Sequence, residues 1–304
     1  MPRYIFSRIG QAVLVMFGVS LLIFYSLHLT GDPAALMMPP GSNQQEIDVF
    51  RHSMGFDQPL LQQYGRYLGN VLRGDLGASL RYEQPVVSLI AARIPATLLL
   101  AATALAWSTA AGLLLGIVSA VWRHSVWDLL ARLLAFSGQA IPVFWLGLLL
   151  IILFSLNLHW LPSGGYGSAS QLLMPAVSLG AYYMSAIARL VRASLIDVLQ
   201  QDYIRTAQAK GLSQTRILIR HALRNALIPV VTVQGMYFAS LLGGALVTEI
   251  IFAWPGIGRL AVQAIQNRDF PLVQAIVLLA ALVFVVVNLL IDLLYVVLNP
   301  RIKL

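Results

Sequence analysis

The chain has 304 residues, of which 59% are hydrophobic and only 11% charged. Soluble globular domains carry roughly 25% charged residues, so most of this chain must face lipid or its own membrane-embedded neighbours. Basic residues that flank membrane spans on one side explain the formal net charge of +8, which therefore does not indicate nucleic-acid binding. The chain contains no cysteine, which excludes disulfides and thiolate metal sites.

Membrane-spanning helices are predicted where the chain runs uncharged for about 20 residues, the length that crosses a ~30 Å hydrocarbon core. The first such run, 9–29, follows basic residues as in a signal peptide, but no small-residue cleavage pattern comes after it. We therefore interpret it as a retained first span. The Pro/Gly/Ser-rich stretch 162–168 divides the uncharged run 133–188 into two spans. The remaining spans are predicted within 94–122, at about 226–248 and at about 270–298, giving six in all.

Apolar residues at helical spacing within the segment 32–93 predict an amphipathic helix between the first two spans. They are Leu60, Leu61, Tyr64, Tyr67, Leu68, Val71 and Leu72. Such a helix either packs along the outer interface against the spans or helps to receive a partner. The sequence thus divides into 1–93, with the first span and an extracytoplasmic segment, and 94–304, with the other five spans.

The distribution of Lys and Arg predicts that both termini lie in the cytoplasm. In this orientation the cytoplasmic pieces hold most of the 20 basic residues, and the only acids among them are Asp128, Asp197 and Asp202. The outer pieces hold most of the acids. The class predicted from these patterns is an all-α, multi-pass membrane protein with six transmembrane helices.

A basic segment between the fourth and fifth spans is the most distinctive part of the sequence. It covers residues 189–224 and contains Arg189, Arg192, Arg205, Lys210, Arg216, Arg220 and Arg224. A structured basic loop on one side of a membrane offers a surface for a partner to hold. The alternative is that the basic residues only anchor the chain to anionic lipid.

The centre of this segment predicts a helix, a glycine bend and a second helix. Asp202 can cap the first helix, and Gly211 fits the left-handed position that ends it. Ser213 can cap the second helix. Ala207 and Ala209 leave room for a close-packed partner.

Two stretches resemble the EAA loop of ATP-binding-cassette (ABC) importer permeases. They are 203–212 (YIRTAQAKGL) and 220–229 (RHALRNALIP). Further motifs narrow the resemblance to the dipeptide/oligopeptide/nickel group of that family: 31–34 (GDPA), 57–60 (DQPL), 74–77 (GDLG), 249–258 (EIIFAWPGIG), 268–271 (RDFP) and 299–301 (NPR). The chain departs from the general pattern in two places. Arg205-Thr206-Ala207 stands where the family has Glu-Ala-Ala, and Arg224 stands where it has proline.

The resemblance implies a type I ABC importer permease fold in a bacterial inner membrane, with the loop 189–229 coupling spans four and five to an ATPase. The residues that it assigns to this contact are Asp202, Tyr203, Arg205, Thr206, Ala207, Ala209, Lys210 and Gly211. The implied partners are a paralogous permease forming a heterodimer, two ATPase subunits that bind ATP and Mg, and an extracytoplasmic substrate-binding protein. ATP-driven closure would then exchange inward for outward access as a rigid-body transition.

The residues themselves indicate that another polypeptide must hydrolyse ATP. The only lysines are Lys210 and Lys303, and neither lies in the phosphate-binding pattern G-x-x-x-x-G-K-[ST]. The histidines form no H-E-x-x-H pair, and Ser137-Gly138 lacks the preceding glycine of a serine-hydrolase motif. We therefore expect a permease subunit that is not an enzyme, with no metal site and no cofactor of its own.

Polar residues within the spans are candidates for the transport path. Asn288 and Asp292 lie four apart on one face of the sixth span, where a charge is costly. Ser137, Gln139 and Pro142 can bend or polarise the third span. Helix packing is the alternative for all of these residues. The candidate contacts with the binding protein, or else a structural cap, are Glu249, Trp254, Pro255 and Gly256 at the outer end of the fifth span.

The substrate predicted from the resemblance is a dipeptide or oligopeptide. Nickel or metal–chelator complexes, and glutathione, are the alternatives, because similar permeases carry them by the same mechanism. A secondary transporter is a competing class, since it also combines membrane spans with an acid at the midplane. Inverted internal repeats would favour that class, and the sequence shows none.

Overall fold

The computed structural model describes residues 2–29, 32–38 and 41–298. The closing motif 299–301 and Lys303 lie outside the described residues. The regular secondary structure of the described residues is helical, apart from one isolated bridge between Ala78 and Pro85. The chain forms two compact units, one made of Met1–Pro95 with Gly256–Leu304 and the other of Ala96–Pro255.

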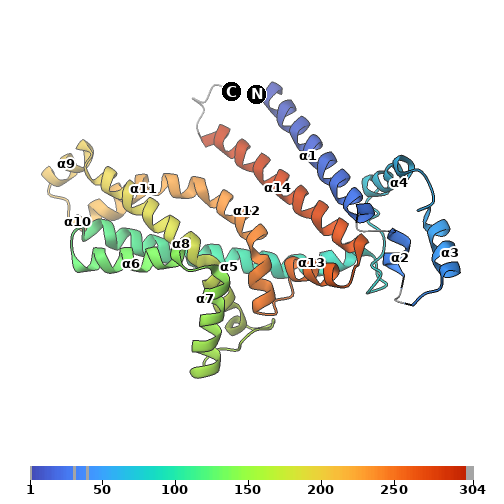
Figure 1. Ribbon diagram of the computed structural model, residues 1–304. Coiled ribbons are helices and arrows are strands. Elements are labelled where there is room, and N and C mark those ends of the chain that lie inside the picture. Colours follow the sequence, from blue (N-terminus) through green and yellow to red (C-terminus); the bar gives the residue numbers. More distant parts are fainter. Residues whose placement is uncertain (1, 30–31, 39–40, 299–304) are drawn as a thin grey trace. The chain divides into compact units, whose positions relative to one another are not determined.

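In the first unit, α1 (Pro2–Leu29) and α14 (Phe270–Leu298) run alongside each other (Figure 1). The amphipathic helix is present as α4 (Leu60–Leu72), which confirms the prediction from its apolar spacing. It packs on α1 through Tyr64, whose hydroxyl lies 2.8 Å from Ser20 Oγ. Tyr64 is the buried residue of α4, while Leu60, Leu61 and Leu72 are exposed.

The rest of this unit contains short helices that local polar contacts hold in place. They are α2 (Pro33–Met37), α3 (Gln44–Met54) and α13 (Ile257–Gln266). Asp32 caps α2, and the Arg51 side chain of α3 hydrogen-bonds it at 2.5 Å, which lowers the pKa of the Asp32 carboxyl. Asp269, fully buried, accepts hydrogen bonds from the Ser79 hydroxyl and from the backbone N–H of Leu80. The Asp269 contacts fix the segment around Ser79 to the start of α14.

The second unit contains the remaining long helices. They are most of α5 (Val86–Val121), α6 (Val126–Ala140), α7 (Val143–Leu150) with the π-helix η1 (Ile151–Asn157), α8 (Ala169–Leu199) and α12 (Ile228–Ile251). Small residues allow α5 and α8 to approach closely: a Cβ on Gly116 would lie 2.7 Å from the Ala188 carbonyl oxygen. Leu100, Leu241 and Trp254 lie in one buried core of this unit.

Three helical stretches are long and apolar enough to cross a membrane: Val86–Val121, Ile228–Ile251 and Phe270–Leu289. A fourth span is formed if the pair Val126–Ala140 and Val143–Asn157, bent by 108°, counts as one. The bend falls at Pro142, as its position in the third predicted span indicated. α8 has 31 residues but is less apolar, because it carries Gln171 as well as Arg189 and Arg192.

Two prolines lie inside helices rather than at their first position. Pro95 and Pro175 lie near the starts of the predicted second and fourth spans, and a proline at the first position of a helix loses no hydrogen bond. The structure places Pro95 inside α5, which begins at Val86, and Pro175 inside α8, which begins at Ala169. The helix α5 therefore extends into polar sequence, since it includes Arg93 before its uncharged stretch.

Candidate functional site

The basic segment folds as a short helix followed by a glycine bend. α8 ends at Leu199, and α9 (Asp202–Ala209) follows after a two-residue turn. Lys210 caps its C-terminus, and Gly211 adopts φ +75°, the left-handed conformation predicted for it. The prediction for Asp202 was wrong, because Gln201 occupies the N-cap position and Asp202 is the first helical residue. Its carboxylate still suits the positive end of the helix and lies 3.5 Å from Arg205.

The two faces of α9 have different surroundings. Ile204 and Ala207 are buried in a core that the loop forms with Leu195 and Ile217. Ala207 therefore packs within its own chain, contrary to the expectation that it leaves room for a partner. We call the opposite side the outer face of α9; its residues, at positions i, i+3, i+4 and i+7, are the exposed Asp202, Arg205, Thr206 and Ala209.

The second half of the loop holds α9 in place. It consists of α10 (Gln214–Arg216), the π-helix η2 (Ile217–Ala222) and α11 (Leu223–Ala226). Ser213 is at the N-cap position of α10 as predicted, although its side chain makes no capping hydrogen bond. Asn225 donates a hydrogen bond of 2.8 Å to the Tyr203 hydroxyl, which joins the two stretches of the EAA-like pattern.

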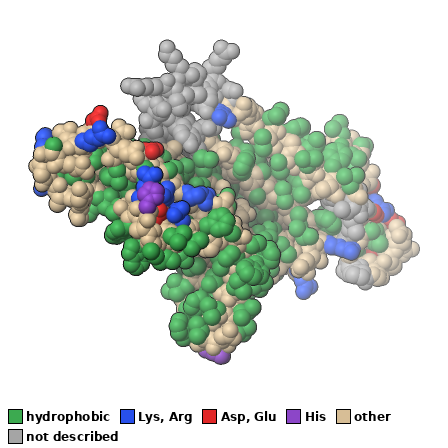
Figure 2. Space-filling model, turned by 60° about the vertical axis from the view of Figure 1, so that its left-hand side comes forward, with side chains coloured by type: hydrophobic (Ala, Val, Ile, Leu, Met, Phe, Trp, Pro, Cys, Tyr) green, Lys and Arg blue, Asp and Glu red, His purple; other side chains and the backbone are tan. Residues whose placement is uncertain are grey.

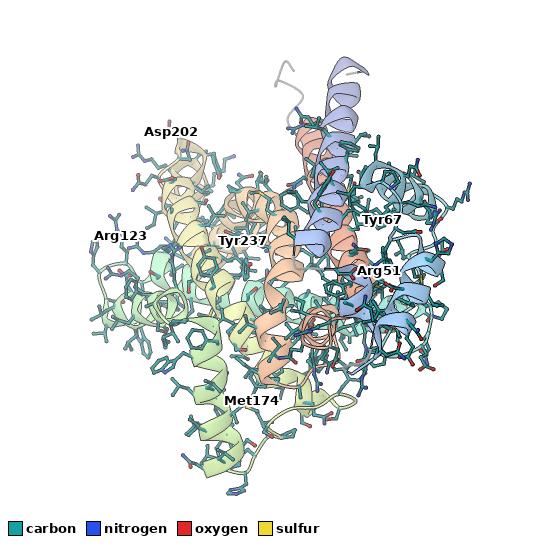
Figure 3. All side chains as sticks on the ribbon, turned by 45° about the vertical axis from the view of Figure 1, so that its right-hand side comes forward. Arg51, Tyr67, Arg123, Met174, Asp202 and Tyr237 are labelled. Carbon is teal, nitrogen blue, oxygen red and sulfur yellow. The ribbon has the colours of Figure 1, made fainter. Side chains whose placement is uncertain are left out.

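A buried carboxylate lies at the same end of this unit. Asp128, 1% exposed, accepts hydrogen bonds from Ser119 Oγ at 2.5 Å and from the His124 backbone N–H at 3.1 Å. Its oxygens lie 3.0 Å from Arg132 Nε and 3.4 Å from Arg192 Nε. The network joins α5, α6 and α8, and Figure 3 shows Asp202 and Arg123 at the same end of these helices.

Sequence reasoning counted Asp128 only as a cytoplasmic acid and missed this network. The available signal was that Asp128 is an isolated acid between Arg123 and Arg132 at the start of a span. Because α8 carries Arg192 and leads directly into α9, the network also fixes the helix that positions the loop.

The residues at the end of α12 are buried. Glu249 is 0% exposed and accepts a hydrogen bond of 2.7 Å from Thr97 Oγ1. Trp254 is 1% exposed, and its Nε1 donates to the Ala96 carbonyl oxygen at 2.8 Å. This burial supports the structural-cap alternative over a direct contact of Glu249 and Trp254 with a binding protein, while Pro255 and Gly256 complete the turn.

The loop 162–168 packs tightly against this turn. Gly165 donates its backbone N–H to the Phe252 carbonyl oxygen at 2.9 Å, and the rings of Tyr166 and Trp254 meet edge to face at 4.9 Å. A Cβ on Gly164 would lie 2.3 Å from the Phe252 carbonyl oxygen. Only glycine permits this approach.

Gly164→Ala is therefore expected to destabilise the protein by about 1–3 kcal/mol, because the added methyl group forces the two loops apart. The measurement is the thermal unfolding midpoint of the purified protein in detergent. Gly243→Ala in α12 is the matched control, because nothing lies within 4 Å of its Cβ position. Equal midpoints for the two variants would contradict the prediction.

The predicted path residues lie in different units. Gln139 is exposed on α6, just before the bend at Pro142. Asn288 on α14 is exposed and lines a cavity of about 210 Å³ together with Arg8 and Phe284. The side chain of Asp292 lies outside the described residues.

A band of aromatic residues between α8 and α12 was not predicted. The ring centroids of Tyr183 and Tyr237 are 5.2 Å apart across the two helices, and those of Tyr182 and Tyr183 are 5.4 Å apart. Figure 3 labels Tyr237. Gln234 donates to Thr109 Oγ1 at 3.1 Å beside it. The signal in the sequence was the Tyr182-Tyr183 pair in the middle of an uncharged span.

No group of three or more potential metal ligands occurs among the described residues.

The fold is that of a membrane permease of an ABC importer. A structure of the MetNI methionine ABC transporter in inward-facing conformations aligns with a TM-score of 0.53 at 19% identity over 68% of this chain and 96% of that one. A structure of an amino acid ABC transporter with histidines aligns with a TM-score of 0.53 at 15% identity, over 68% of this chain and 93% of that one. At these identities the likeness concerns the fold.

The chain belongs to the family described as binding-protein-dependent transport system inner membrane component, which matches residues 112–304. The N-terminal family of the same transport systems matches residues 1–101. The glutathione transport system permease protein GsiC of Escherichia coli O6:H1 is 44% identical over 100% of this chain and 99% of its own length. GsiC of Shigella dysenteriae serotype 1 is also 44% identical, over 100% of this chain and 99% of its own length. The resemblance seen in the motifs is thus confirmed: the chain is an inner-membrane permease subunit of the ABC importer family.

Proposed function

We propose that the chain forms half of the translocation path for peptides, glutathione included, that an extracytoplasmic binding protein delivers. The observation that carries the substrate class is the 44% identity to permeases named for glutathione transport, which extends over the whole chain. Glutathione is itself a tripeptide, so peptide and glutathione import belong to one substrate class.

The proposed arrangement in the membrane has six spans with both termini in the cytoplasm. The spans are α1, α5, the bent pair α6 with α7 and η1, α8, α12 and α14. The length of α1, 28 residues, and of α8, 31 residues, supports adding these two helices to the more apolar ones. The excess of basic residues in the segments assigned to the cytoplasm supports the orientation with both termini on that side.

The outer face of α9 is the proposed contact with an ATPase subunit. The remaining residues that the resemblance assigns to this contact border it: Tyr203, Lys210 and Gly211. ATP and Mg bind to the ATPase subunits, and this chain supplies neither cofactor nor hydrolysis. The exposure of the outer face, next to a tightly packed inner face, supports this role. Two connections can transmit a displacement of α9 to the spans. One is the hydrogen bond between Tyr203 and Asn225, and the other is the short turn that joins α9 to α8.

A paralogous permease subunit is proposed to complete the path. The aromatic band of Tyr182, Tyr183 and Tyr237 is a surface along which a peptide can move, because ring faces and hydroxyls bind varied side chains without strong selection. Gln139, Asn288 and Asp292 remain candidate path or gate positions. Pro255 and Gly256 remain candidate contacts with the binding protein, together with Glu249 and Trp254 if the turn opens.

The substrate is tested by calorimetric titration of the partner binding protein with glutathione, a dipeptide series and a nickel–chelator complex. We expect binding of glutathione or peptides and none of the nickel complex. A binding protein that ignores peptides and binds the metal complex would overturn the proposed substrate. Uptake into proteoliposomes that contain both permeases and both ATPases must then require ATP; uptake driven by an ion gradient alone would indicate a secondary transporter.

A further inference from the structure

A cavity between α5, α6 and α8 combines three guanidinium groups with apolar walls. Its volume is about 380 Å³, within the roughly 300–1,000 Å³ of small-molecule sites. Arg132, Arg189 and Arg192 contribute the charges. The walls are formed by apolar side chains, among them Leu115, Ala131, Ala135 and Phe136.

The described residues do not balance the positive charge inside this cavity. Asp128 is the one acid that pairs with these arginines among the described residues, and it interacts with Arg132 and Arg192. Each guanidinium has five N–H donors, so both retain donors after these contacts. Arg189 forms no ion pair within the described part of the chain. Three positive charges against one negative charge favour an anionic ligand, and guanidinium groups match the oxygens of a phosphate.

The surroundings of the cavity indicate that this phosphate belongs to a lipid. Phe136 lines the cavity and is 68% exposed, and it continues a run of exposed leucines along α6, so the cavity opens towards a surface suited to acyl chains. Trp122 and Trp127 are exposed at the junction of α5 and α6, and exposed tryptophans mark the level of lipid headgroups. On the face that Figure 2 draws, basic side chains lie directly beside hydrophobic ones.

We propose that this cavity binds the phosphate of an anionic phospholipid through Arg189 together with Arg132 and Arg192, with an acyl chain lying along Phe136 and α6. The site is independent of the transported substrate and of the outer face of α9. Because Arg192 also supports α8, an occupied site would stiffen the helix that leads into α9.

The test measures lipid retained by the complete transporter, purified in detergent with phosphatidylglycerol or phosphatidylcholine, by native mass spectrometry. We expect selective retention of phosphatidylglycerol. Arg189→Gln is expected to weaken it about fivefold, the effect of one basic residue at a lipid surface. Arg189→Lys keeps the charge and is expected to retain most of the binding. Arg189 pairs with no acid among the described residues, so these variants are expected to fold.

Arg123→Gln is the matched control, because Arg123 is exposed at the same end of the helices but does not line the cavity. Its phosphatidylglycerol retention is expected to equal that of the unmodified chain. Equal retention in Arg189→Gln, or an equal loss in Arg123→Gln, would overturn the proposed site. Displacement of the lipid by millimolar inorganic phosphate would show that the cavity takes soluble phosphate, which also overturns the assignment to lipid.

Discussion

Asparagine in place of Asp128 is expected to destabilise the unit Ala96–Pro255 by about 3 kcal/mol, the largest effect on stability of any substitution proposed. Removing one partner of a buried ion pair costs roughly 3–5 kcal/mol, because it leaves the other charge without compensation. Arg192 and Arg132 lie within 3.4 Å of the carboxylate, with side chains 28% and 53% exposed. Because both arginines are partly accessible to water, the expected loss of stability lies at the lower end of this 3–5 kcal/mol range.

The measurement is the thermal unfolding midpoint of the purified transporter in detergent, together with its yield from membranes. Asp202→Asn is the matched control, since the Asp202 side chain is 96% exposed and its ion pair with Arg205 at 3.5 Å contributes little. A midpoint for Asp128→Asn equal to that of Asp202→Asn would show that the network does not support the helices.

The helices that the sequence predicted well are those whose pattern is local. The span 270–298 and the amphipathic helix Leu60–Leu72 appear with the expected bounds, because apolar length and helical spacing act within one element. The bend at Gly211 follows from a conformation that glycine alone adopts without strain. The family resemblance rests on such local motifs as well.

The features that the sequence did not reveal depend on contacts between distant segments. Asp128 meets Arg192 across 64 residues, and Thr97 meets Glu249 across 152 residues. The position of an acid at one end of a span does not by itself identify the distant residue that covers it. The same reason explains Ala207: a small residue on a short helix suits a close partner, and here that partner is the chain's own core.

Ala209→Trp is expected to abolish ATP-driven uptake without altering the stability of the permease. Ala209 is on the outer face of α9, where a tryptophan remains in solvent in the isolated chain but overfills a close-packed contact with an ATPase. Overpacking costs about 1–3 kcal/mol, which corresponds to roughly fivefold to 150-fold weaker ATPase association. Co-purification of the ATPase subunits and uptake into proteoliposomes measure the effect.

Ala207→Trp, only two residues away, separates the two faces of α9. Ala207 is 7% exposed in the core with Leu195 and Ile217, so the same tryptophan is expected to lower the unfolding midpoint of the permease itself. Ala209→Trp should leave that midpoint unchanged while ATPase co-purification falls. Uptake by Ala209→Trp at the level of the unmodified chain would show that the outer face of α9 does not contact the ATPase. A stability loss in Ala209→Trp equal to that in Ala207→Trp would mean that both faces are packed within the chain, and the coupling surface would then have to lie elsewhere in the loop 189–229.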